Sequence, residues 1–275
     1  ITDALFTAGA VTNISGTSAS KNISFTQGSD NSNFSGDVVL RADGAITVNG
    51  ASAANLAAAN IYIDTDQGAL DSNDNTTLRA TAKIEVNTKA HGSGNGGNID
   101  IKSNSDTLTL TGQDIVITSA TASGAINATG TQDVTITSGS AVTTLTVNAG
   151  RDITAANATA STAGGDVSLT AARNIAITTL SAADVVSVTT TGGNVTAANV
   201  TSTANDVTIN AAGNINITGA ATAVDQLVMN ATNAGIITAA DVSATGSGGD
   251  VRLSAAGNAT VTTGSANDDF IVSGA

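Results

Sequence analysis

The sequence predicts an all-β chain that folds as a parallel β-helix, a β-solenoid of about 13 coils. Apolar residues alternate with polar ones in stretches such as DVSLTAARNIAIT (166–178) and DVTINAAGNINIT (206–218), and this period of two is typical of half-buried strands. Each stretch holds two short strands joined by a turn, and such units recur about every 20 residues, as in repeat proteins. The chain contains no proline, as expected if strand ladders run along nearly its whole length.

Composition narrows the fold and the partners. Aromatic residues make up 2% of the chain, and Val, Ile, Leu and Ala supply most of its 41% apolar residues, so we expect a narrow core. The net charge of -13 argues against nucleic acid and against insertion into anionic membranes. The chain has no cysteine, which excludes disulfides and thiolate chemistry. No apolar run approaches the length of a membrane-spanning helix, so we expect none.

Along the chain, each coil opens with a first strand in which two residues, at positions i and i+2, point into the core. The predicted inward pairs are Ala4/Phe6, Ile23/Phe25, Val38/Leu40, Ile61/Ile63, Ile84/Val86, Leu108/Leu110, Ile126/Ala128, Leu145/Val147, Val167/Leu169, Val186/Val188, Val207/Ile209, Leu227/Met229, Val251/Leu253 and Phe270/Val272.

A second strand follows most first strands, and a third apolar row completes the predicted core. The second strand has inward pairs at Ile46/Val48, Ile115/Ile117, Val134/Ile136, Ile175/Ile177 and Ile215/Ile217, with smaller residues at Ile153/Ala155 and Val195/Ala197. The third row passes through Leu56, Leu180, Val200 and Val242. We expect residues 1–275 to form a single β-helical domain, most irregular over 38–107 and most regular over 108–275. Each coil depends on its neighbours to bury its apolar residues.

Three units show a family resemblance most clearly. They are GDVSLTAARNIAITTLSA (165–182), NDVTINAAGNINITGA (205–220) and GDVRLSAAGNATVTTGSA (249–266), and they resemble the repeats of filamentous-haemagglutinin-type proteins. The resemblance implies a right-handed parallel β-helix and a secreted, extracellular place at the bacterial cell surface, in adhesion or as a filament. Members exported by two-partner secretion carry Asn-Pro signatures in an amino-terminal domain, which a chain without proline cannot contain. We therefore expect a passenger segment or a distant relative exported in another way.

The many Asp residues are candidates for carboxylate chemistry of the kind that cleaves polysaccharides. However, they recur at fixed repeat positions, directly before a predicted strand. Asp37, Asp166, Asp206 and Asp250 precede first strands, and Asp114, Asp133 and Asp152 precede second strands. A residue that recurs at one repeat position serves the repeat, so we expect these Asp residues to cap turns. We predict no catalytic residues, no cofactor and no enzyme activity.

The stretch DTDQGALDSND (64–74) breaks the repeat and has the oxygen-rich composition of a calcium loop. Its candidate ligands are Asp64, Asp66, Asp71 and Asp74. The spacing departs from the EF-hand pattern, with Gly68 one place early and Asn75 in the place of the bidentate Glu. We therefore expect a solvated acidic loop, with specific calcium binding as the alternative.

The glycine-rich stretch NTKAHGSGNGG (87–97) holds His91, the only histidine. No Gly-Lys-Ser/Thr follows it, so its glycines do not form a phosphate-binding loop. All four lysines lie in the first 102 residues, at Lys21, Lys83, Lys89 and Lys102. We expect a surface excursion here, with a loop that contacts a partner as the alternative.

Three functional classes remain. We expect a non-enzymatic structural or adhesive rod, either a filament subunit or a segment of a surface adhesin, with a host-cell or glycan receptor as a possible partner. The first alternative is a β-helix that binds or cleaves polysaccharide with its site in 38–107. The second is an ice-binding β-solenoid, which requires a regular outward row of Thr. Only three Thr occur in the predicted outward row of the first strands, which runs Leu5, Ser24, Val39, Tyr62, Glu85, Thr109, Asn127, Thr146, Ser168, Ser187, Thr208, Val228, Arg252, Ile271. A row along the turns stays open.

Both ends of the chain carry apolar strand residues, Leu5 and Phe6 at one end and Phe270, Ile271 and Val272 at the other. Neither end shows the proline or the cluster of lysines that blunts an exposed strand edge in many soluble β-proteins. We therefore expect end-to-end stacking, either onto further β-helical coils of a longer chain or onto another copy.

Overall fold

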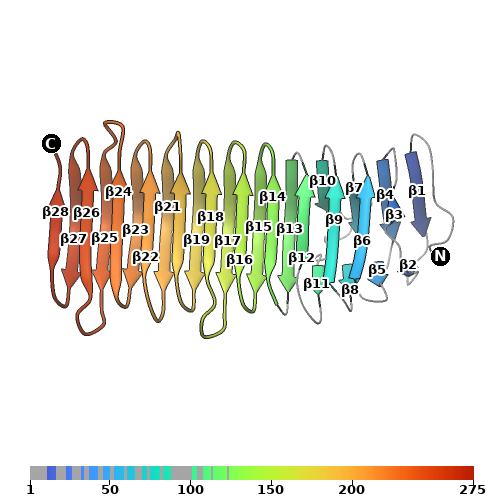
Figure 1. Cartoon of the computed structure of the whole chain (residues 1–275), viewed down its shortest axis with the longest axis horizontal. Helices are drawn as coiled ribbons and strands as arrows, with labels where there is room; N and C mark the ends of the chain where they lie inside the picture. Colours follow the sequence, from blue (N-terminus) through green and yellow to red (C-terminus); the bar gives the residue numbers. More distant parts are fainter. Residues whose placement is uncertain are drawn as a thin grey trace, which may run out of the picture. The chain divides into compact units, whose positions relative to one another are not determined.

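The computed structural model describes residues 124–275 in full. Between residues 11 and 122 it describes the backbone of the strands, together with the side chains of Leu110, Ile115, Ile117, Ala120 and Ala122. All regular structure in this described part is β, and every described strand pair is parallel (Figure 1). The predicted parallel β-helix is therefore confirmed. The described residues contain no helix long and apolar enough to cross a membrane.

The chain is divided into two compact units, Ile1–Gly139 and Ser140–Ala275. Strand β15 (Val134–Ala141) spans the boundary between them. The expectation of a single domain over 1–275 stays a prediction.

In Ile1–Gly139 the strands form three stacked series. The first series is β1 (Val11–Gly16), β4 (Asp37–Ala42), β7 (Ile61–Thr65), β10 (Lys83–Asn87) and β13 (Asp114–Ala122). The second is β2 (Ile23–Thr26), β5 (Ile46–Asn49), β8 (Leu70–Ser72) and β11 (Ile101–Ser103), which pairs with the second half of β13. The third is β3 (Ser32–Asn33), β6 (Ala53–Ala58), β9 (Asn75–Ala80), β12 (Leu108–Gly112) and β14 (Ile126–Gly130).

This arrangement corrects the predicted strand assignment before residue 108. Ile84 and Val86 were expected in the first strand, yet they pair with Ile115 and Ile117, which were expected in the second. The physical reason is that alternation places a residue inside or outside but does not say which face of the coil its strand joins. Where a coil is unusually long, as between Ile84 and its partner Ile115, counting residues along the sequence no longer identifies the face of the coil to which a strand belongs.

Further assignments in this unit are wrong for the same reason. Ile23 and Phe25 pair with Ile46 and Val48, although they were expected on different faces. Leu56 pairs with Leu78 in the third series, so it does not belong with Leu180. The pair Ala4/Phe6 lies outside the described residues.

In Ser140–Ala275 two series suffice, because the long strands bend and serve two faces. The long strands are β17 (Ile153–Ala160), β19 (Ile175–Ala182), β21 (Val195–Ser202), β23 (Ile215–Ala223), β25 (Ile237–Ala244) and β27 (Ala259–Ala266). The short strands are β16 (Leu145–Ala149), β18 (Val167–Ala171), β20 (Val186–Thr190), β22 (Val207–Ala211), β24 (Gln226–Ala231), β26 (Asp250–Ala255) and β28 (Phe270–Ser273).

The bend is visible in the burial of each long strand. In β19 the buried residues are Ile175, Ile177, Leu180 and Ala182, so the alternation shifts by one residue between Ile177 and Leu180. The chain turns a corner there, and both halves face the core. The predicted third row is confirmed in this unit, since Leu180, Val200 and Val242 are all buried.

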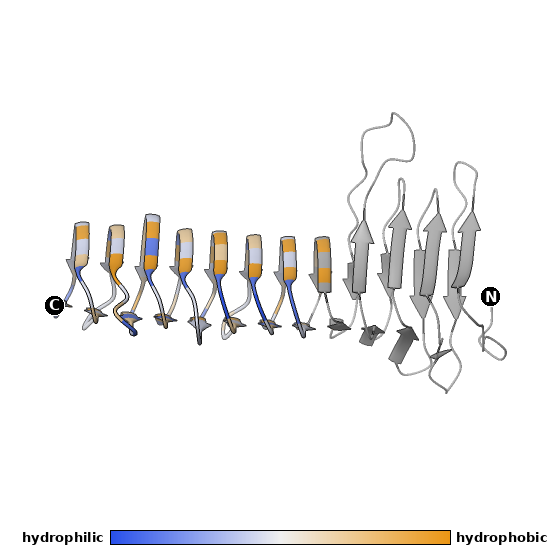
Figure 2. Cartoon of the chain, turned by 90° about the horizontal axis from the view of Figure 1, so that it is seen from above, coloured by the Kyte–Doolittle hydropathy of each residue, from blue (hydrophilic) through white to orange (hydrophobic). Residues whose placement is uncertain are grey.

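The predicted first strands are also confirmed in this unit. Val186 pairs with Val207 and Val188 with Ile209, and all four side chains are buried. Figure 2 shows apolar residues on the strands and hydrophilic residues in the connections between them. Burial of each Val, Leu or Ile side chain contributes about 1.5–3 kcal/mol to the free energy of folding before conformational entropy is subtracted. Every coil between β16 and β28 contains several of these buried residues.

Candidate functional site

The candidate calcium ligands lie in the part of the chain where the structure describes strand backbone only. Asp64 is in β7 and Asp71 is in β8, two strands of different series. In register, Asp64 lies opposite Arg41 and Asp71 opposite Lys102. Each of these two positions is therefore next to a basic residue on the neighbouring strand. Asp66 and Asp74 lie outside the described residues, so calcium binding stays a prediction.

The glycine-rich stretch lies almost wholly outside the described part of the chain, His91 included. Only its first residue, Asn87, falls in a strand, β10. Lys83 and Lys102 are placed in β10 and β11 by their backbone. Lys21 and Lys89 also lie outside the described residues. The contact with a partner predicted for this region is therefore untested.

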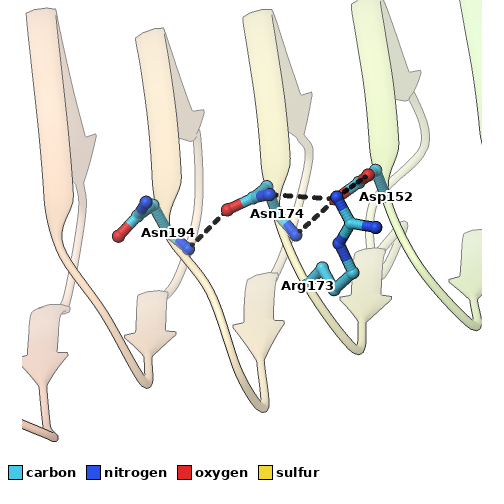
Figure 3. Close-up of polar contacts among 4 residues, drawn as sticks. All are labelled: Asp152, Arg173, Asn174 and Asn194. Atoms are coloured by element: carbon cyan, nitrogen blue, oxygen red, sulfur yellow. Dashed lines mark hydrogen bonds and ion pairs between the residues drawn. The ribbon is translucent and has the colours of Figure 1, made fainter.

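The turns that precede the long strands of Ser140–Ala275 carry a continuous side-chain relay. The backbone N–H of Asn174 donates to Oδ1 of Asp152 at 2.9 Å, and the backbone N–H of Asn194 donates to Oδ1 of Asn174 at 3.0 Å (Figure 3). The relay continues to the N–H of Asn214 at 2.7 Å and to that of Ile236 at 2.9 Å. We call the four acceptors Asp152, Asn174, Asn194 and Asn214 the Asx ladder.

Each member of the Asx ladder lies directly before the long strand of its own coil, and its side-chain oxygen reaches one coil further along the stack. The Nδ2 of Asn174 also donates to Asp152 at 3.0 Å, and the Arg173 guanidinium lies 3.2 Å from the other oxygen of Asp152 (Figure 3). The relay stops at Ile236, whose side chain has no acceptor. The ladder therefore fixes the spacing of five successive turns by side-chain bonds in addition to the strand ladders.

A second corner, before the short strands, uses Asp in the same way. Oδ1 of Asp166 accepts the N–H of Val185 at 3.0 Å, Oδ1 of Asp206 that of Gln226 at 2.9 Å, and Oδ1 of Asp250 that of Asp269 at 3.1 Å. The bond from Asp269, and after it the Arg252 guanidinium at 2.9 Å, holds the pKa of the Asp250 carboxyl below its ordinary value.

These bonds confirm the predicted structural role for Asp152, Asp166, Asp206 and Asp250. Asp37 is a correction. It was expected before a first strand, but it opens β4 in the series that continues through β10 to β13. It therefore belongs with Asp114, which opens β13. The backbone carbonyl of Asp133 accepts the N–H of Ile115 at 2.9 Å.

The core described in 124–275 holds two buried polar side chains, and both have partners. Oγ1 of Thr190 donates to the carbonyl of Gly193 at 2.8 Å, and Oγ of Ser202 donates to the carbonyl of Asp184. No group of three or more His, Asp or Glu side chains is placed to hold a metal ion among the residues that the structure describes. The polar groups in the described core are thus engaged in holding turns.

Comparison with protein-family models, with curated proteins and with solved structures finds no match to this chain. Its function has to be inferred from its own surfaces.

The outward face of the long strands in Ser140–Ala275 is almost uncharged. Asp241 is the one ionisable residue within β17, β19, β21, β23, β25 and β27. An unbroken column of hydroxyl residues runs across all six strands in strand register, and its members are Thr159, Ser181, Thr201, Thr222, Ser243 and Ser265. The hydroxyls of Ser243 and Thr222 lie 3.3 Å apart. This column offers a periodic set of hydrogen-bonding groups.

The predicted outward row of the first strands is confirmed from Thr146 to Ile271, where Arg252 interrupts it. Tyr62 and Glu85 do not belong to that row, because they pair with each other in the series that continues to Val116. The hydroxyl column lies on a different face, which the expected strand assignment did not single out.

The C-terminal strands of this unit expose apolar side chains. Phe270, Ile271 and Val272 of β28 are 41%, 47% and 41% exposed, whereas Val251 and Leu253 of β26, the partners of Phe270 and Val272, are buried. The Asx ladder is the feature that sequence reasoning did not place, whereas the apolar strand at Phe270, Ile271 and Val272 was expected from the sequence. The recurring Asn directly before an apolar pair, in NIAI, NVTA and NINI, was a signal for the ladder.

Proposed function

We propose that this chain is a non-enzymatic structural or adhesive segment of a secreted protein at the bacterial cell surface. Its coils stack end to end with further β-helical coils, in a filament or in a longer adhesin. The observation that carries the proposal is the coil-to-coil continuity of the described stack, in which Asp and Asn side chains at the turns accept backbone N–H groups of the following coil.

The use of the polar residues supports a structural role. Asp152, Asp166, Asp206 and Asp250 all accept backbone N–H groups of the following coil. Residues committed to coil spacing are poorly suited to proton transfer, which requires a group free to reach substrate. The resemblance of the repeats to filamentous-haemagglutinin-type proteins points the same way, and with it to a host-cell or glycan receptor. The net charge of -13 disfavours nucleic acid as a partner.

Electron micrographs of the purified protein test this proposal. We expect particles that join end to end into continuous filaments. A panel of acidic and neutral polysaccharides, assayed for new reducing ends with and without calcium, tests the enzymatic alternative with its site in 38–107. Turnover that a single Asp substitution abolishes, with folding intact, would replace the structural proposal by the enzymatic one.

The hydroxyl column favours one second candidate function, binding to ice. Thr159, Ser181, Thr201, Thr222, Ser243 and Ser265 repeat at the spacing of stacked strands, which is about 4.8 Å. If this column binds ice, the protein inhibits ice recrystallisation and Thr201→Arg abolishes that inhibition, because a long charged side chain breaks the row. Thr208→Arg, on the short strand β22, is the matched control.

A further inference from the structure

The coils of the Ser140–Ala275 unit are of two kinds, which alternate from β16 to β27. In coils of the first kind, an Asp lies directly before the first inward residue of the short strand. These Asp coils are β18–β19 with Asp166, β22–β23 with Asp206 and β26–β27 with Asp250. In coils of the second kind, the long strand opens with Ile or Val, then Thr-Ala-Ala, then Asn or Asp. These TAA coils are β16–β17, β20–β21 and β24–β25, with the strand openings at 153–157, 195–199 and 237–241.

The spacing of the sequence follows the pair of coils. The TAA openings are 42 residues apart in both steps, from 153 to 195 and from 195 to 237. The Asp positions are 40 and then 44 residues apart, from 166 to 206 and from 206 to 250. The three units that stand out in the sequence are all Asp coils, and they lie at 165–182, 205–220 and 249–266. The exact repeat is therefore a pair of coils.

One inward column of the long strands alternates in size with the same period. Its members are Ala155, Ile177, Ala197, Ile217, Ala239 and Val261. The alanines belong to TAA coils and the larger residues to Asp coils. The first five side chains are at most 6% exposed, and interiors are close-packed, so the space beside each Ala is filled by other side chains.

The alternation is specific to that column. The column two residues earlier in the same strands holds a β-branched residue in each of its first five coils, and these are Ile153, Ile175, Val195, Ile215 and Ile237. Stacking by itself therefore accepts a large side chain in every coil. The small residue in every second coil of the alternating column distinguishes the neighbours of an Asp coil from the Asp coil itself.

The two kinds of coil boundary also differ in their polar bonds. Asp166 accepts the N–H of Val185 at 3.0 Å, and Asp206 accepts that of Gln226 at 2.9 Å. Both bonds run from an Asp coil to the TAA coil that follows it. In TAA coils the same position holds Thr144, Val185 and Gln226, which carry no carboxylate. The step from a TAA coil to the next Asp coil therefore has no carboxylate bond from this position.

The outer surface repeats with the pair as well. At the corner of the long strand, the TAA coils expose Asn157, Asn199 and Asp241, whereas Asp coils have Thr179, Ala220 and Thr263 in the same column. Stacked strands are about 4.8 Å apart, so equivalent groups recur roughly every 10 Å. A partner that lies along this corner therefore meets identical groups once per pair.

We propose that an Asp coil and the TAA coil after it form the unit from which this stack is built. The alternating column and the Asp bond decide which coils fit together. Two neighbouring TAA coils would leave a cavity beside their alanines, and two neighbouring Asp coils would crowd their isoleucines. This inference concerns recognition between coils, goes beyond the proposed function and does not require it.

Deletions from the whole chain test the unit. Removal of 166–205 takes out one pair, β18–β21, and joins Gly165 to Asp206, so both the Gly-Asp junction and the alternation are kept. We expect a melting temperature within about 5 °C of wild type, because coils interact with their nearest neighbours only. Removal of 166–184 takes out one Asp coil, and removal of 185–205 takes out one TAA coil. Each single-coil deletion should lower the melting temperature by more than about 10 °C, although it removes fewer residues.

A swap within the core gives a second readout at constant coil number. Ala197→Ile/Ile217→Ala keeps the composition of the core but places Ile beside Ile177 and Ala beside Ala239. It should lower the melting temperature by more than about 5 °C. The matched control is Val195→Ile/Ile215→Val, in the same two strands but in the column that does not alternate. It should stay within about 2 °C of wild type.

Circular dichroism of all five variants decides the matter. A pair deletion that melts near wild type, together with destabilised single-coil deletions, supports the unit. If the pair deletion loses as much as a single-coil deletion, or if either single-coil deletion melts as high as the pair deletion, the pair is not the unit. Equal melting temperatures for the two swaps would show that the alternating column does not select the neighbouring coil.

Discussion

The ring of Phe270 lies against Gly264, so close that a Cβ added to Gly264 would lie 2.5 Å from Cε2 of Phe270. The column of Gly264 holds Val242 one coil earlier, and that of Phe270 holds Val251. The smallest residue of one column therefore faces the largest residue of the other. The absence of a side chain at Gly264 therefore leaves room for the ring of Phe270, the bulkiest of the described inward residues.

Gly264→Ala should therefore lower the free energy of unfolding by about 1 kcal/mol, because the half-exposed ring must swing away from the core. The double variant Gly264→Ala/Phe270→Val should recover that loss, since Val leaves room for the added methyl group. Thermal or urea unfolding of the two variants against Phe270→Val alone measures the coupling. If Gly264→Ala costs the same in the wild-type and in the Phe270→Val background, the contact carries no energy.

The Asx ladder makes a second prediction. Asn194→Ala removes the acceptor of the N–H of Asn214, a bond of 2.7 Å, and should cost about 1 kcal/mol of unfolding free energy. Thr196→Ala, an exposed outward position of the same coil in β21, is the control and should change the stability by less than about 0.5 kcal/mol. Urea unfolding of both variants measures the difference. Two midpoints that agree would mean that the ladder adds no stability.

The register of β22 leads to a third prediction. Val207→Asp places a charge in a core where the side chain is fully buried, and should destabilise the chain by several kcal/mol. Thr208→Asp adds the same carboxylate on the outer side of the same strand, where it stays hydrated, and should be nearly silent. Melting temperatures by circular dichroism decide between them. Equal melting temperatures would contradict the register described for this strand.

The carboxyl of Asp250 leads to a fourth prediction, which concerns the dependence of stability on pH. The N–H of Asp269, and after it Arg252, lowers the pKa of Asp250 from its ordinary value of 3.8. Because the folded-state pKa is the lower one, the contribution of Asp250 to stability is present in full above pH 3.8 and is lost as the pH falls through the folded-state pKa. Asp250→Asn should therefore flatten the decline of the melting temperature on acidification below about pH 4, measured against wild type in the same buffers. A decline of unchanged slope would show that this carboxyl is not linked to folding.

How much of the fold the sequence predicts depends on coil length. From Leu145 to Val272 the coils vary little in length, so alternation alone placed Val186, Val207 and Leu227 in one buried column. Between Ile84 and Ile115, which are direct partners in the ladder, the coil is longer, and the same alternation gave the wrong face. The alternation of apolar and polar residues shows which residues are buried. Which face of the coil a strand joins depends on the geometry of the turns, which the residue types do not encode.

The candidate site was less predictable for a related reason. Asn174, Asn194 and Asn214 share a place before a strand, but asparagine is frequent throughout the chain. Only when the turns are aligned in space does each Oδ1 come to lie beside the next N–H. The structural role of Asp166, Asp206 and Asp250 was easier to predict, because aspartate recurs directly before an apolar-x-apolar strand.

End-to-end stacking of the coils is the central claim of the proposed function, and the mass of the whole chain in solution tests it most directly. Multi-angle light scattering over a range of protein concentrations should give a mass that rises above the 26.5 kDa of one chain and continues to rise without a fixed stoichiometry, because a head-to-tail contact need not close. Phe270→Asp should hold the mass near that of one chain. A wild-type mass that stays at 26.5 kDa at every concentration would contradict the account.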